Sequence, residues 1–140
     1  LVHFYDAFKD TNVDIDLFNI TGGNTPIDPV SLSPFMLNNT TKAYYNNEHF
    51  MDMLKYSQPI SEAQPDKYDA VYFTGGHGVM YDFPENKFHL QNEIKHRGAS
   101  YHFGRVPFTS TLEVDDRIIT GQNPQSPSQV AEAVKKQLLF

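Results

Sequence analysis

The residues with the clearest potential for chemistry form a glycine-rich loop, Gly75-Gly76-His77-Gly78, directly after the apolar run Ala70-Val71-Tyr72-Phe73-Thr74. Ligands of open α/β sheets bind beyond the carboxyl ends of the strands. Glycines there let backbone N–H groups approach a reacting atom and stabilise a developing oxyanion. The same residues also suit a tight strand-to-helix turn without a ligand, so both interpretations stay open. A phosphate loop is disfavoured, because the P-loop lysine and the spacing of a dinucleotide motif are missing.

Two further places carry polar groups with possible roles at a site. Asp82 and Glu85 are three residues apart, which suits acid/base work, although a helix-start cap with surface charge is the favoured interpretation. Asn123 lies in Gly121-Gln122-Asn123-Pro124, either a structural turn or the rim of a site at a strand end. The histidines form no close ligand pair, so no metal site is expected. The serine elbow of α/β hydrolases is missing as well.

The apolar pattern predicts the elements that would position these residues. Leu1, Phe4, Tyr5 and Phe8 form one helix face, and residues 13–17 alternate as a strand does. Residues 70–74 lack alternation, which predicts a strand with both faces covered in a parallel sheet.

Shorter signals predict caps and turns in the rest of the chain. Asn46 or Asn47 is expected to cap a short helix with Phe50, Met53 and Leu54 inward, and Gly98 to end a helix in a left-handed conformation. Asp115-Asp116 is expected to turn a hairpin, and Ser126 to begin the last helix. The alternation of helices and strands indicates an α/β fold.

Composition limits the possible partners. The 140 residues carry a net charge of −6, which argues against nucleic acid and anionic membranes, because both require a basic face. The chain has no cysteine, which excludes disulfides and thiolate chemistry within these residues and favours a cytoplasmic setting. Two N-x-T triplets, at Asn19 and Asn39, match the glycosylation pattern without other support for secretion.

Three ordered stretches of the sequence resemble one family. Residues 68–78, continued by 81–86, resemble the strand-and-loop signature of the ThiJ/PfpI superfamily, and residues 118–126 resemble its C-terminal signature. Gly22-Gly23 with Pro26-Ile27-Asp28-Pro29 is similar to a stretch typical of the branch with glyoxalase III-like enzymes and heat-shock chaperones. The resemblance implies a flavodoxin-like three-layer α/β/α sandwich with a mainly parallel sheet, incomplete in this chain.

The same resemblance implies catalytic parts that this sequence does not contain. The family places a cysteine, followed by a histidine, on a strand-to-helix elbow, supported by a glutamate. The glutamate would lie just before Leu1, and the elbow after Asn86, where residues 88–94 instead resemble a later helix. We therefore expect residues 1–140 to be one domain that lacks its N-terminal strand and a central segment near residues 87–88.

Only a few residues can take the family's site roles by position. Gly75 and Gly76 would offer backbone amides, and His77 would line the pocket; Asp82 and Asn123 are candidates for its rim. No cofactor and no metal are implied.

The resemblance suggests four functions for the protein. The first is cofactor-independent conversion of methylglyoxal-type 2-oxoaldehydes to 2-hydroxy acids, with protein deglycation as a linked activity. The alternatives are a stress-induced holding chaperone, an intracellular peptidase or amidase, and a catalytically dead relative, which the literal sequence would be. A small-molecule substrate and a homodimer are the expected partners, with neither nucleic acid nor membrane.

Overall fold

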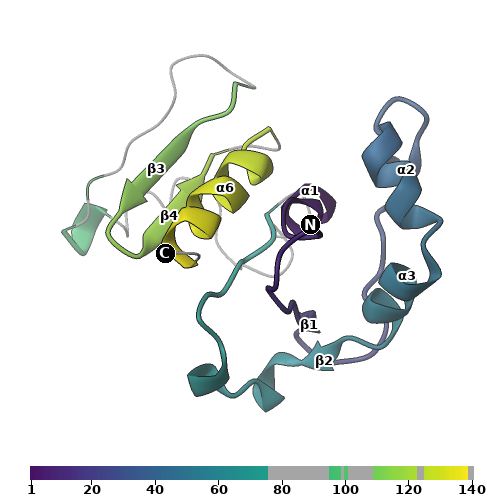
Figure 1. Cartoon of the computed structure of the whole chain (residues 1–140), viewed down its shortest axis with the longest axis horizontal. Helices are drawn as coiled ribbons and strands as arrows, with labels where there is room; N and C mark the ends of the chain where they lie inside the picture. Colours follow the sequence, from purple (N-terminus) through teal and green to yellow (C-terminus); the bar gives the residue numbers. More distant parts are fainter. Residues whose placement is uncertain (76–94, 99, 101–108, 123–124, 139–140) are drawn as a thin grey trace. The chain divides into compact units, whose positions relative to one another are not determined.

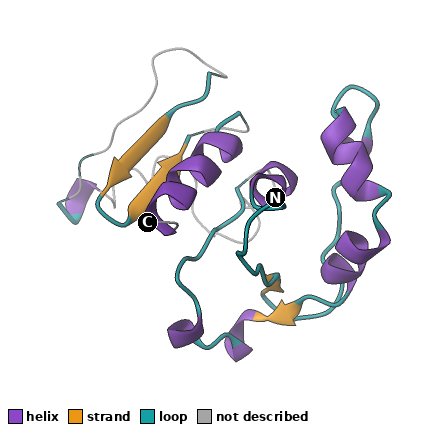
Figure 2. Cartoon of the chain, viewed as in Figure 1, coloured by secondary structure: helices purple, strands orange, loops and turns teal. Residues whose placement is uncertain are grey.

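The computed structural model describes residues 1–75, 95–98, 100, 109–122 and 125–138 (Figure 1). The chain divides into two compact units, Leu1–Val71 and Tyr72–Phe140, which are treated separately below. The described elements of the first unit are α1 (Val2–Ala7), β1 (Phe18–Asn19), η1 (Pro29–Leu32), α2 (Asn39–Tyr45), α3 (Glu48–Lys55), β2 (Gln58–Pro59), η2 (Ile60–Glu62) and η3 (Pro65–Lys67). Those of the second are β3 (Leu112–Asp115), β4 (Ile118–Gly121) and α6 (Pro127–Leu138) (Figure 2).

The core of the first unit is built by its three α-helices. Phe4 of α1 and Phe8, the C-cap residue of that helix, are buried, as the helical spacing predicts, and so are Phe50 and Leu54 of α3. Tyr5 and Phe50 pack edge-on with ring centroids 5.0 Å apart, an arrangement that aromatic quadrupoles favour. Tyr44 of α2 joins them, 5.0 Å from Phe50.

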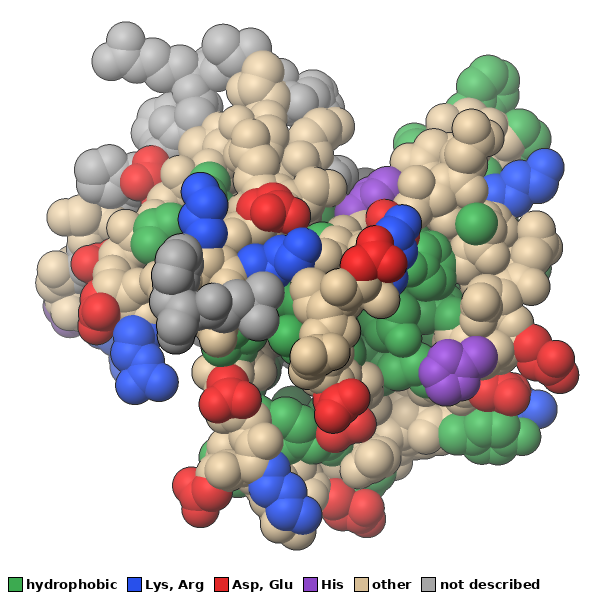
Figure 3. All heavy atoms as spheres, in the orientation of Figure 1, with side chains coloured by type: hydrophobic (Ala, Val, Ile, Leu, Met, Phe, Trp, Pro, Cys, Tyr) green, Lys and Arg blue, Asp and Glu red, His purple; other side chains and the backbone are tan. Residues whose placement is uncertain are grey.

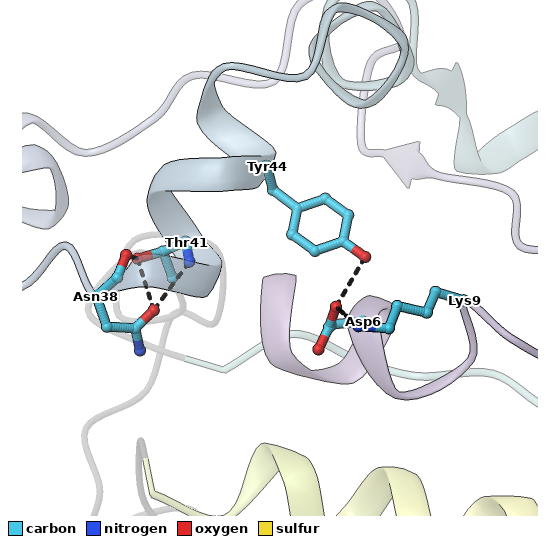
Figure 4. A network of polar contacts seen from close by, with 5 residues as sticks. All are labelled: Asp6, Lys9, Asn38, Thr41 and Tyr44. Atoms are coloured by element: carbon cyan, nitrogen blue, oxygen red, sulfur yellow. Dashed lines mark hydrogen bonds and ion pairs between the residues drawn. The ribbon is translucent and has the colours of Figure 1, made fainter.

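Polar contacts tie α1 to α2 and fix the helix starts (Figure 4). The Tyr44 hydroxyl donates to Asp6 Oδ1 at 3.0 Å, and Lys9 Nζ lies 3.2 Å from the same carboxylate. Asn38 caps α2 by accepting the Thr41 amide. The Asn38 cap was not predicted from the sequence. Its signal is present there, because an asparagine stands three residues before the threonine whose amide it accepts.

The predicted cap of α3 is confirmed. Asn47 is its N-cap, and its side-chain oxygen accepts the Phe50 amide at 2.9 Å. Such a bond satisfies one of the amides that the first helical turn leaves without a partner. The helix therefore begins where the local sequence indicates, with its apolar face inward.

The only parallel ladder among the described residues joins β1 and β2, with Phe18 opposite Gln58 and Asn19 opposite Pro59. The strand predicted over residues 13–17 is shifted: its side chains alternate between half-buried and exposed, yet the ladder begins only at Phe18. Alternation of apolar and polar residues indicates which side chains face inward. It does not show where the backbone finds a partner strand, which a hydrogen-bonded ladder requires.

The expectation of a covered strand over residues 70–74 is wrong for this structure. No strand is assigned within residues 70–75, and Val71 and Phe73 are 70% and 71% exposed. A covered parallel strand requires neighbouring strands and helices on both faces. None of the described residues supplies a strand that pairs with this segment.

The described strands and helix of the second unit form a hairpin packed against α6. β3 and β4 are antiparallel, with Asp115 opposite Ile118, so the turn is Asp116-Arg117, one residue later than predicted. Asp116 has a φ of 51°, which a two-residue hairpin turn favours. Gln137 of α6 donates to the Asp116 carbonyl at 2.7 Å. The predicted left-handed Gly98 is also confirmed, with a φ of 87°.

Candidate functional site

Gly75 is the one predicted site residue that the structure describes. It is exposed, and a Cβ added to it would meet no atom within 4 Å. An unobstructed backbone is what an amide donor to a substrate oxygen requires. Gly76, His77, Asp82 and Asn123 lie outside the described residues, so their roles stay predictions.

The segment that leads to Gly75 is anchored beside β1. The Tyr68 hydroxyl donates to Asp16 Oδ2 at 2.8 Å, and its ring packs edge-on against Phe18 at 5.7 Å. The hydrogen bond to the Asp16 carboxylate raises the pKa of Tyr68, because it favours the neutral phenol. Burial likewise raises the pKa of Tyr72.

A polar cluster occupies the loop that follows β1 and includes the residue that precedes β2. The Asn19 side chain accepts the amides of Thr21 and Gly22 and donates to the Gly23 carbonyl at 3.1 Å. It also donates to Thr25 Oγ1 at 3.0 Å. The loop is therefore held by one carboxamide that satisfies four backbone and side-chain groups.

The end of α3 completes this cluster. Ser57 is only 5% exposed, and its hydroxyl oxygen lies 2.9 Å from Thr25 Oγ1. The same hydroxyl is within hydrogen-bond distance of the Met53 and Leu54 carbonyl oxygens. Every described buried side-chain polar atom has a partner. The cluster was missed from the sequence because its members are up to 38 residues apart and share no motif.

Gly22 explains why this loop begins with glycines. It has a φ of 76°, and an added Cβ would lie 2.9 Å from Pro59 Cδ, so a side chain is excluded by both conformation and contact. Gly23, with a φ of 77°, is also left-handed but has open space around it. The family-like Gly-Gly pair thus has a local structural cause.

In the second unit, Ser126, the residue before α6, is hydrogen-bonded to Thr111, the residue before β3. The Ser126 hydroxyl donates to the Thr111 carbonyl at 3.1 Å, and the Thr111 amide donates back at 3.3 Å. The Gln122 amide also donates to the Thr111 carbonyl, at 3.2 Å. Gln122 and Ser126, which lie on either side of residues 123–124, are therefore both hydrogen-bonded to the residue before β3. Ser126 was predicted only as a helix start.

The described part of the chain contains neither a cluster of metal-binding side chains nor a membrane-spanning helix. Within it, no three His, Asp or Glu side chains lie close enough together to hold a metal ion. The helices resolved there are all too short or too polar to cross a bilayer.

The chain is similar to known proteins in both sequence and structure. No protein-family model matches the chain. The X-ray structure of the Rapid Encystment Protein 24 KDa of Francisella tularensis superposes with a TM-score of 0.79 at 26% identity, covering 99% of this chain and 87% of that one. Glyoxalase 3 of Candida albicans is 30% identical over 88 residues. These similarities support the resemblance to the ThiJ/PfpI superfamily that the sequence motifs indicate.

The predicted α/β fold with a parallel pairing is confirmed. A further solved structure, at 22% identity, shares the fold with a TM-score of 0.70 over 99% of this chain and 86% of its own. The match to Glyoxalase 3 spans 61% of this chain and 37% of the Candida protein. The chain therefore corresponds to well under half the length of that curated relative.

Proposed function

We propose that the whole protein is a glyoxalase III-like enzyme that converts 2-oxoaldehydes such as methylglyoxal to 2-hydroxy acids. The observation that carries the proposal is the similarity to Glyoxalase 3 of Candida albicans over 88 residues. Gly75 supports it, because its backbone is exposed and open to a ligand. The proposal includes protein deglycation as a linked activity, and a cytoplasmic homodimer.

The proposed reaction needs a thiol that residues 1–140 do not contain. The thiolate adds to the aldehyde carbon and gives a hemithioacetal, whose oxyanion the amides of Gly75 and Gly76 would stabilise. A base moves the proton from the former aldehyde carbon to the neighbouring carbonyl carbon, which oxidises the first carbon and reduces the second. Water then cleaves the thioester, so the sum is oxoaldehyde plus water to hydroxy acid, with the thiol restored.

We place the missing thiol in a segment absent near residues 87–88. The order of the sequence signatures supports such a gap. Residues 88–94, which follow the loop signature directly, resemble a helix that the family places later, and the chain contains no cysteine.

The first experiment asks whether the thiol exists and works. Intact mass and thiol titration of the protein purified from its complete gene should reveal a cysteine, and incubation with methylglyoxal should yield lactate. The 140-residue chain is the matched control and should yield none. A protein that contains the cysteine and still forms no lactate would end this proposal.

A second experiment tests the amide of Gly75 in that complete protein. Gly75→Pro removes the N–H donor, whereas Gly75→Ala keeps it and meets no atom within 4 Å. Loss of one oxyanion donor lowers kcat by about 100- to 1000-fold. We expect that loss for the proline variant and nearly unchanged turnover for alanine. Equal turnover in both variants would show that the Gly75 amide takes no part.

A holding chaperone is the second candidate, and exposed apolar side chains favour it. In the first unit Phe35 is 99% exposed, and Ile20, Val30 and Met36 are 63–65% exposed. Figure 3 shows hydrophobic side chains, in green, at the surface of the molecule. Exposed apolar surface is what captures unfolded clients, and it needs no thiol. Suppression of client aggregation by the 140-residue chain should weaken in Phe35→Ser and persist in the control Glu48→Ser. Identical suppression by both variants would count against this surface.

A further inference from the structure

No further inference is drawn: the strongest candidate, the open groove between β3 and α6 lined by Leu112, Val114 and Ala133 with Glu132 and Lys136 at its side, is an apolar face for which nothing in the described part of the chain shows what covers it.

Discussion

Gly121 gives the sharpest test of how the second unit is packed. It ends β4 so close to α6 that an added Cβ would lie 2.7 Å from Ser126 Cβ and 2.8 Å from Val130 Cγ2. Both neighbours are buried, at 1% and 5% exposure, so neither can swing into solvent. Gly121→Ala must therefore push α6 away from the hairpin. Overpacking of this kind costs about 1–3 kcal/mol, and we expect that loss in the free energy of unfolding.

Alanine substitutions at three other glycines distinguish the cost of steric contact at the added Cβ from the cost of a left-handed backbone conformation. Gly75→Ala has open space and no left-handed φ, so its effect should stay within about 0.5 kcal/mol. Gly23→Ala has open space but a φ of 77°, which should cost about 1–2 kcal/mol of strain. Gly22→Ala combines a φ of 76° with a Cβ 2.9 Å from Pro59, so it should be the most destabilising of the four.

Urea unfolding followed by far-UV circular dichroism measures this order. The midpoint should fall in Gly121→Ala at an unchanged m-value, since the surface exposed on unfolding is the same. Val130→Ala removes one of the two clashing atoms, so the double variant should lose less than the sum of the single losses. The reasoning fails if Gly121→Ala unfolds at the same urea concentration as Gly75→Ala.

Three further predictions follow from single contacts. Burial and, second, the hydrogen bond to Asp6 raise the pKa of Tyr44 to about 12, so the contribution of Tyr44 to folding stability is present below pH 10 and is lost as the pH rises toward 12. Between pH 10 and 12 the unmodified chain should therefore lose more stability than the Tyr44→Phe variant. Equal losses in the two proteins would contradict this prediction. Asn47→Ala should lower the free energy of unfolding by about 1 kcal/mol through loss of its cap, whereas the neighbouring Asn46→Ala should change it little; equal effects in urea titrations would refute the capping role. Asp116→Gly should raise the thermal midpoint by relieving the φ of 51°, and a lower midpoint would show that no strain is stored there.

Local signals were predicted well from this sequence, because their physical cause lies within a few residues. The Asn47 cap depends on an amide three residues later, and the left-handed Gly98 on the glycine itself. The buried face of α1 follows from the helical spacing of its aromatic residues. The hairpin was predicted one residue too early, since Asp116 and not Asp115 takes the positive φ.

Long-range features were predicted poorly, for an equally physical reason. Whether residues 13–17 form a ladder depends on a partner strand some 40 residues later, which alternation cannot reveal. The Asn19 cluster depends on Ser57, and the clamp at the β4–α6 turn on Thr111. The sequence predicted Gly75 as a site residue, and neither the Asn19 cluster nor the hydrogen bonds of Ser126 to Thr111 were predicted.

The exposed segment 70–74 bears most directly on the proposed gap. Full burial of a valine or phenylalanine side chain contributes about 1.5–3 kcal/mol, so exposures of 70% at Val71 and 71% at Phe73 forgo about 2–4 kcal/mol together. That is a large share of the 5–15 kcal/mol that stabilises a typical domain. Residues 70–74 carry no charge, so they are suited to a buried strand with a neighbouring strand on each side. A central segment inserted near residues 87–88 would supply such a strand together with the thiol. If the complete protein contains that segment, Val71→Ala and Phe73→Ala should destabilise it far more than they destabilise the 140-residue chain; equal losses in the two proteins would leave the exposed run unexplained by the gap.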